Sequence, residues 1–272
     1  MSQWDFSPLK LVVFDWAGTV VDFGSRAPVV ALVRALKQEG VKIEEEDARA
    51  GMGLAKLDHV RNLFSLSNVK ANWKEAHGAL PGEEDALRIF HALEPLMFEA
   101  ASEASELIPG VAHVAATLHT AGLKIASCTG YTRPMMGAVI ARAAEQGYRP
   151  DLVTCAGETL QGRPSPLMVY RSCVELGVWP TNAVVKIDDA TVGIEEGLSA
   201  GAWTIGIAAS GNGVGLSREA LAALSQTERD ARIAHSRRAL EAAGAHYVVD
   251  TTADILPVIA HIAARMRAGA RP

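Results

Sequence analysis

The 272-residue chain is 49% hydrophobic with a net charge of -5, enough apolar material for packed domains, and its scattered lysines and arginines leave no basic footprint for nucleic acid. The first ten residues lack the pattern of a signal peptide, and no apolar run approaches membrane-spanning length. Three cysteines without CxxC spacing predict neither a disulfide framework nor a zinc site, so we expect a cytoplasmic protein that acts on a small molecule.

Short β-branched runs alternate with helix-like stretches along much of the chain. This alternation is typical of an α/β fold, in which helices cover a Rossmann-like parallel sheet. After the fifth run, residues 217–244 are strongly charged with helical spacing and predict helical surface. The runs predicted as strands are 11–14, 123–127, 151–154, 183–187, 203–207 and 246–249.

About a hundred residues separate the first predicted strand from the second, which is too long for a simple connection. The interval contains amphipathic stretches that are broken by glycines and by one Pro-Gly pair. We therefore predict an α-helical cap domain at 24–104, inserted into an α/β core domain made of 1–23 and 105–272. The helical stretches predicted in the cap are 27–38, 44–50, 54–64 and 83–104.

Polar residues follow four of the predicted strands. In parallel sheets, functional residues gather at the carboxyl ends of the strands, so we expect these side chains to meet. Together they supply a carboxylate, a hydroxyl, a cation and a second carboxylate, which are the parts needed for phosphoryl transfer through an aspartyl phosphate. The residues are Asp15, Thr129 with Gly130, Arg163, and Asp188 with Asp189.

Each of these residues has an expected role. Asp15 attacks phosphorus, while Thr129, Gly130 and Arg163 hold the phosphoryl oxygens. Asp189 and Asp15 bind Mg²⁺, which prefers oxygen ligands. A plainer interpretation also exists for each, since an aspartate after a strand can cap a turn and Asp188–Asp189 can be an ordinary loop pair.

The segments DWAGTVVD, SCTG, GRPSP and IDD, in this order, resemble the four motifs of the haloacid dehalogenase superfamily. The resemblance covers nearly the whole chain and implies the fold predicted above. One position departs from it: phosphatases of the superfamily carry a second aspartate two positions after the nucleophile, and this chain has Ala17 there. Alanine cannot transfer a proton to a leaving alkoxide, so the sequence disfavours a phosphomonoesterase.

A lysine near the start of a predicted cap helix provides another reactive group. Lys56 and His59 are three residues apart and share one face of this helix. A lysine that faces a closed site loses proton affinity and can condense with an aldehyde, and the resulting iminium withdraws electrons from the neighbouring carbon. That chemistry suits cleavage of a carbon-phosphorus bond, although a lone lysine is more often a solvated helix residue.

The segments DWAGTVVDFGS, MGLAKLDH, TGYTR, GRP and AHYVVD resemble the phosphonoacetaldehyde hydrolase (phosphonatase) family. The resemblance implies a Schiff base on Lys56, a nucleophile at Asp15 and Mg²⁺ held by Asp15, Asp189 and the Ala17 carbonyl. It also implies a homodimer formed through the cap. Gly193 stands where some relatives carry a further acidic residue, which leaves Asp188 or water to complete the Mg²⁺ shell. The residues implied near the aldehyde are Met52, Tyr131 and His59, the last as a proton shuttle.

Three other functions remain open from the sequence. An ordinary phosphatase or phosphomutase needs the acid that Ala17 lacks. A haloacid dehalogenase uses an aspartate nucleophile on carbon but needs neither Arg163 nor Asp189. A binding protein that kept the fold without activity is the third, because a fold alone does not determine function.

Overall fold

The computed structural model describes residues 4–272, and within them lies one parallel six-stranded sheet with the order β3-β2-β1-β4-β5-β6. The strand order reverses at β1, which pairs with β2 on one side and β4 on the other, and this creates a crevice at the carboxyl edge. The sequence-based α/β fold is confirmed. The strands are β1 (Leu11–Phe14), β2 (Lys124–Cys128), β3 (Leu152–Thr154), β4 (Val184–Asp188), β5 (Trp203–Ile207) and β6 (Tyr247–Val249).

Helices cover both faces of the sheet because β1, like its neighbours, is apolar on both sides. Val12 and Phe14 pack with α6 (Val111–Thr120), α7 (Arg133–Glu145) and α12 (Ile255–Arg267). Leu11 and Val13 pack on the opposite face, mainly against α8 (Leu167–Glu175). Such continuous apolar strands are typical of buried parallel sheets. The remaining core elements are α9 (Thr191–Ser199), α10 (Arg218–Ala223), α11 (Gln226–Ala242) and the short 3₁₀ turns η1 (Thr181–Ala183) and η2 (Thr252–Asp254).

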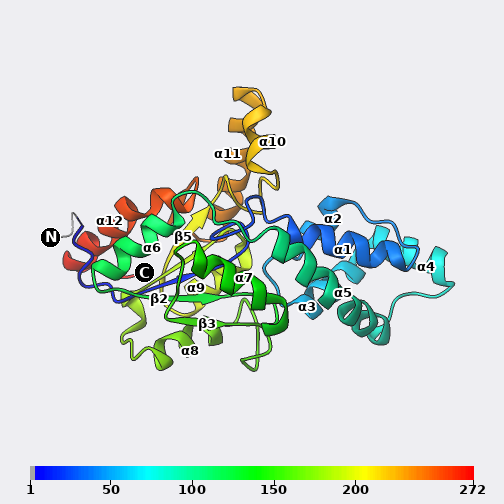
Figure 1. Ribbon diagram of the computed structural model, residues 1–272, viewed down its shortest axis with the longest axis horizontal. Helices are drawn as coiled ribbons and strands as arrows, with labels where there is room; N and C mark the ends of the chain where they lie inside the picture. Colours follow the sequence, from blue (N-terminus) through cyan, green and yellow to red (C-terminus); the bar gives the residue numbers. More distant parts are fainter. Residues whose placement is uncertain (1–3) are drawn as a thin grey trace.

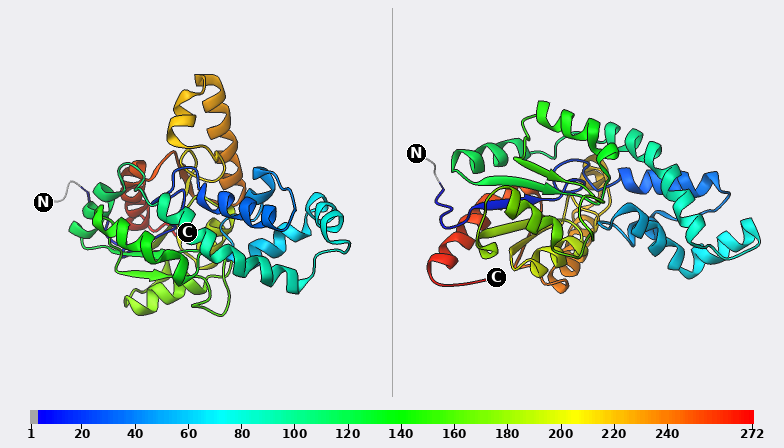
Figure 2. Two further views of the ribbon diagram at one scale, coloured as in Figure 1. Left: turned by 45° about the vertical axis from the view of Figure 1, so that its right-hand side comes forward. Right: turned by 90° about the horizontal axis from the view of Figure 1, so that it is seen from below.

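A helical insertion lies between β1 and β2, as expected. Figure 1 shows its helices gathered on one side of the sheet, away from the two ends of the chain, and Figure 2 shows the same separation from below. The bounds of the two domains, 24–104 for the cap and 1–23 with 105–272 for the core, stay a prediction, and residues 1–3 lie outside the described range. The helices are α1 (Ala27–Gln38), α2 (Glu45–Arg49), α3 (Lys56–Ser65), α4 (Ser67–His77) and α5 (Glu83–Glu103).

Helix α4 was not predicted from the sequence. It is mostly polar and buries only Val69 and Trp73, which are four residues apart and face the other cap helices. The charged segment after β5, expected as one stretch of helical surface, forms α10 and α11 with a break at Leu224–Ser225, and Figure 1 shows the pair projecting from the core. Across residues 4–272, every helix is too short or too polar to span a bilayer.

Candidate active site

A cavity of about 20 Å³ lies where the cap meets the carboxyl edge of the sheet. It brings together all of the predicted site residues except Asp188 and His59. Its volume is close to that of a single water molecule, so the structure shows the cap closed over the site, and a substrate can enter only if the cap moves. The lining residues are Asp15, Ala17, Ser25, Pro28, Met52, Gly53, Lys56, Thr129, Gly130, Tyr131, Arg163 and Asp189.

Three buried carboxyl groups form the acidic wall of this site. Because β1 and β4 are neighbours, Asp15 lies beside Asp188 and Asp189, and oxygen atoms of the three lie within 4.8 Å of one another. Burial and the charge of Asp188 raise the pKa of Asp15 to about 6, and burial with both neighbouring charges raises the pKa of Asp189 well above its usual range. The cluster fits a metal ion, because a bound cation would relieve this repulsion.

Asp188 differs from the other two carboxylates. Burial alone would raise its pKa, but Arg163 and Lys186 hold that pKa below its ordinary value. Its Oδ2 accepts a hydrogen bond from Lys186 Nζ at 2.8 Å, and its Oδ1 accepts one from the Ala190 amide at 3.0 Å. A side chain at Gly193 would start 2.0 Å from this carboxyl group, so Asp188 fills the space that an acidic residue at 193 would need.

Arg163 is buried and contacts both the nucleophile and the charged residues behind it. Its Nη1 lies 2.8 Å from Asp15 Oδ1, and its Nη2 donates to the Cys128 carbonyl at 2.8 Å. On the far side, its Nε donates to Glu196 Oε2 at 3.0 Å, and Lys186 Nζ lies 3.3 Å from the same oxygen. A fixed guanidinium beside the nucleophile can clamp a phosphoryl group.

Lys186 and Glu196 were missed by the sequence analysis. A signal was present for Lys186, since a lysine within the apolar strand VVKID must be paired where it is buried. Glu196 carries no comparable signal, because the next residue back, Glu195, is exposed and looks the same in sequence. The pairing becomes visible only when α9 packs against β4.

The loop after β2 fits closely against the cap. Thr129 Oγ1 accepts a hydrogen bond from the Tyr131 amide at 3.1 Å, which orients the hydroxyl at the start of the loop. A Cβ atom at Gly130 would lie 2.3 Å from the Leu54 carbonyl oxygen, so only glycine lets the cap approach this far. Thr129 and Gly130 therefore lie directly beneath the cap segment that carries Met52 and Gly53.

Lys56 is the first residue of α3 and points its amine into the closed cavity. Its side chain is 2% exposed, and Nζ lies 5.1 Å from the centre of the Tyr131 ring. Burial lowers the pKa of Lys56 to about 8, opposed by the charge of Asp15 and assisted by that of Arg163. At a pKa of about 8 instead of 10.5, the neutral, nucleophilic amine is roughly 300-fold more abundant near neutral pH.

His59 lies outside the residues that line the cavity. It is fully buried, and its Nε2–H donates to the Ala48 carbonyl at 2.8 Å, which joins α3 to α2. Its Nδ1 has no hydrogen-bond partner among residues 4–272. Burial and the nearby charge of Lys56 lower the pKa of His59 to about 3, so the imidazole is neutral. Its role as a proton shuttle stays a prediction.

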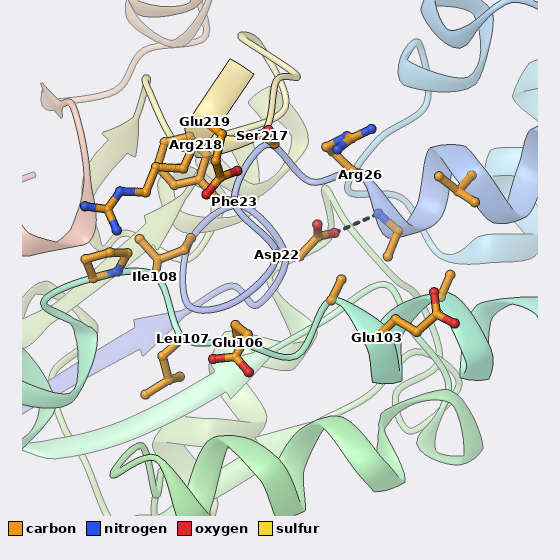
Figure 3. Close-up of a pocket in the computed structure, with 15 residues that line it drawn as sticks. Asp22, Phe23, Arg26, Glu103, Glu106, Leu107, Ile108, Ser217, Arg218 and Glu219 are labelled. Carbon is orange, nitrogen blue, oxygen red and sulfur yellow. Dashed lines mark hydrogen bonds between the residues drawn. The ribbon is translucent and has the colours of Figure 1, made fainter. Parts of the chain in front are cut away.

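A wider cavity of about 610 Å³ lies at the junction between cap and core, and its lining residues differ from those of the site (Figure 3). Asp22, in its wall, accepts a hydrogen bond from the Ala27 amide at 2.9 Å and so anchors the start of α1. Its remaining wall mixes Arg26 and Arg218 with glutamates, which gives no single charge to select a ligand. We therefore take the cavity of about 20 Å³ as the candidate active site.

Comparisons with known proteins identify the family of the chain. Residues 9–201 match the family model of the haloacid dehalogenase-like hydrolases. The chain is 44% identical to the phosphonoacetaldehyde hydrolase of Paraburkholderia phytofirmans, over 97% of this chain and 99% of that one. The crystal structure of a phosphonoacetaldehyde hydrolase-like protein from Oleispira antarctica superposes with a TM-score of 0.96 at 39% identity, covering 100% of this chain and 99% of that one.

A more distant likeness shows the fold alone. The crystal structure of β-phosphoglucomutase from Clostridium difficile superposes with a TM-score of 0.68 at 16% identity, covering 96% of this chain and 99% of that one. The family model and the high identity over nearly full length are much stronger evidence of relationship than this similarity of fold. The chain therefore belongs to the haloacid dehalogenase-like hydrolases and, among them, to the phosphonoacetaldehyde hydrolase family.

Proposed function

We propose that this protein hydrolyses the carbon-phosphorus bond of phosphonoacetaldehyde to acetaldehyde and phosphate, with Lys56 as the Schiff-base amine and Asp15 as the nucleophile. The observation that carries the proposal is the shared cavity: a buried lysine with a lowered pKa faces the same closed space as an aspartate, an arginine and a threonine. Relatives named for this activity are 40–44% identical to the chain.

Lys56 carries out the first half of the reaction. Its neutral amine adds to the aldehyde carbon, water leaves, and the protonated imine draws electrons from the adjacent carbon. A direct break of the carbon-phosphorus bond would expel a carbanion, whereas the iminium accepts that electron pair as a neutral enamine. Tyr131 and Met52 line the cavity beside the amine and exclude bulk water from the imine.

Residues of the core domain carry out the second half. An oxygen of Asp15 attacks phosphorus while the bond to carbon breaks, which leaves an aspartyl phosphate and the enamine. Arg163, Thr129 and the Gly130 amide hold the phosphoryl oxygens. Water then releases phosphate from Asp15, the enamine takes a proton on carbon, and a second water hydrolyses the imine to acetaldehyde and free Lys56.

We infer that the acidic cluster binds Mg²⁺ through Asp15, Asp189 and the Ala17 carbonyl, because all three line the cavity and oxygen donors suit this ion. When bound, Mg²⁺ neutralises charge on the phosphoryl oxygens and on the neighbouring carboxylates. Arg163 Nη1 pairs with Asp15 Oδ1 and keeps the carboxylate oriented for attack.

Ala17 supports this reaction over hydrolysis of a phosphate ester. It lines the cavity next to the nucleophile, and its methyl group cannot protonate a leaving alkoxide. An enamine leaving group does not need that acid, because the electron pair enters the iminium.

Product analysis tests the proposal. Purified protein is incubated with phosphonoacetaldehyde and Mg²⁺, and both phosphate and acetaldehyde are measured. Equal amounts of the two products, abolished by chelation and restored by added Mg²⁺, are expected. Release of phosphate from sugar phosphates, with none from phosphonoacetaldehyde, would contradict it.

We also propose a homodimer formed through the cap. Val30 on α1 and Phe98 on α5 leave apolar surface exposed, at 43% and 46% of each residue, which suits a partner surface. Sedimentation equilibrium is expected to give the mass of two chains, and Val30→Asp together with Phe98→Asp is expected to reduce it to one. A wild-type monomer at micromolar concentration would contradict this.

A further inference from the structure

Arg49, the last residue of α2, makes a dense set of contacts between cap and core. Its Nη1 donates to the carbonyls of Gly24 at 3.1 Å and Ser25 at 3.4 Å and to Asn212 Oδ1 at 2.9 Å. Its Nη2 donates to the Gly215 carbonyl at 2.9 Å. A side chain at residue 215 would start 2.7 Å from the Arg49 guanidinium carbon, so this loop is shaped around the arginine.

The acceptors belong to two separate segments. Gly24 and Ser25 lie at the connection from β1 into the cap, and Asn212 and Gly215 lie in the core loop that follows β5. Arg49 therefore ties a cap helix to both the connection and the core. Burial lowers the pKa of Arg49, and four oxygen acceptors from these two segments surround its Nη1 and Nη2.

Asn212 links Arg49 to the acidic cluster. Its backbone amide donates to Asp189 Oδ2 at 2.6 Å, while its side chain accepts from Arg49. A single residue thus contacts both the cap arginine and a proposed Mg²⁺ ligand. A cavity of about 140 Å³ runs along the same contacts, and its walls include Arg49, Met52, Asp189 and Asn212.

Arg49 also begins the segment that enters the site. The Met52 amide donates to the Arg49 carbonyl at 3.1 Å, and residues 50–55 then lead to Lys56 at the start of α3. His59 fixes the other side of this segment by donating to the Ala48 carbonyl. The position of Arg49 therefore helps to determine where Met52 and Lys56 lie relative to the core.

We propose that Arg49 is a positioning residue that holds the cap closed and, through Asn212, couples this closure to divalent-cation binding at Asp189. The inference rests on the proposed function for the identity of the cation and the role of Lys56. Coupling between two sites is reciprocal: if closure favours Mg²⁺ binding, Mg²⁺ favours closure to the same degree. Loss of the contact weakens both together.

The experiment measures Mg²⁺ binding and cap closure without turnover. Isothermal titration gives the Mg²⁺ dissociation constant, and hydrogen exchange of residues 50–56 reports how often the cap opens. In wild type, Mg²⁺ is expected to slow exchange in this segment. In Arg49→Met, we expect Mg²⁺ affinity about tenfold weaker and exchange that no longer responds to Mg²⁺.

Other variants separate coupling from general loss of structure. Arg34→Met removes an exposed cap arginine, paired at 3.5 Å with Glu99, and is expected to behave like wild type. Arg49→Lys keeps the charge but not the planar fork of donors, and its Mg²⁺ affinity is expected to lie between those of wild type and Arg49→Met. Asn212→Ala keeps the amide that holds Asp189 but loses the acceptor for Arg49, so its effect on Mg²⁺ affinity is expected not to add to that of Arg49→Met.

Unchanged Mg²⁺ affinity in folded Arg49→Met, or additive effects in the double variant, would overturn the inference. If Arg49→Met does not fold, Asn212→Ala alone decides it by the same two measurements. The proposed function can fail separately: a protein that does not cleave phosphonoacetaldehyde but retains this coupling contradicts only the reaction.

Discussion

The core and the cap contribute to the candidate site in different ways. Core residues reach it from the ends of β1, β2 and β4 and from the loop after β3, and a buried network of charges behind Arg163 holds them. The cap reaches it mainly through residues 52–56, held by contacts at Arg49 and His59. The residues proposed for phosphoryl transfer are therefore held in place by the core itself, whereas the position of the Lys56 amine depends on closure of the cap.

This difference implies that the two halves of the reaction can be separated by substitution. Changes in the core should remove phosphoryl transfer but leave the imine. Loss of the Lys56 amine in the cap should remove the imine but leave binding of Mg²⁺ and phosphate. The first prediction below tests that separation, and the next two test the contacts that hold the core and the cap.

The largest effect is expected from Lys56→Arg. Arginine keeps the positive charge but cannot form an imine, so turnover is expected to fall by more than about 10⁴-fold, while the affinities for Mg²⁺ and phosphate change by less than about threefold. Steady-state kinetics and isothermal titration measure both. Lys70→Arg, on the exposed face of α4, is the matched control. Substantial turnover by Lys56→Arg would remove the Schiff base from the reaction.

Glu196→Gln tests the contacts that hold the core. The change leaves Arg163 and Lys186 short of a buried negative charge, and we expect the free energy of unfolding to fall by about 3 kcal/mol. Urea denaturation measures this. The neighbouring Glu195→Gln is exposed and is expected to stay within about 0.5 kcal/mol of wild type. Equal stabilities of the two variants would show that the network does not hold the core.

His59→Gln gives a smaller, pH-dependent effect in the cap. The pKa of His59 is about 3 in the folded protein and 6.5 when unfolded, so the unfolded state binds more protons between these values. Stability from the neutral imidazole is therefore complete above pH 6.5 and is lost as pH falls toward 3. Between pH 6 and 4, the slope of unfolding free energy against pH is expected to be about 1.4 kcal/mol per unit smaller in His59→Gln.

Denaturation midpoints across this pH range decide the outcome. The glutamine can still donate to the Ala48 carbonyl, so stability at pH 7 serves as the internal control. Parallel slopes for the variant and wild type would mean that His59 is accessible to protons in the folded cap. In that case its prediction as a proton shuttle would gain support.

Much of the core could be predicted from the sequence because its signals are local. A short apolar run followed by Asp15, Thr129 or Asp189 indicates both a strand and the edge where its functional residue lies. The reversal of strand order then brings these ends together. Even the replacement of the expected second aspartate by Ala17 can be seen from its position two residues after Asp15.

The rest depends on contacts between segments far apart in the chain. Arg49 and Asn212 are 163 residues apart, and neither lies in a recognisable motif. Helix α4 was missed because its apolar side, Val69 and Trp73, is narrow and has meaning only against the neighbouring cap helices. The place of His59 outside the cavity depends on how α3 turns against α2, which the spacing from Lys56 does not determine.

Borohydride trapping tests the imine on Lys56 most directly. The protein is incubated with phosphonoacetaldehyde and Mg²⁺, reduced with sodium borohydride, and digested for peptide mass spectrometry. We expect a stable adduct on Lys56 in step with loss of activity, because reduction makes the imine permanent. Full activity after reduction, with Lys56 unmodified, would contradict the proposed mechanism.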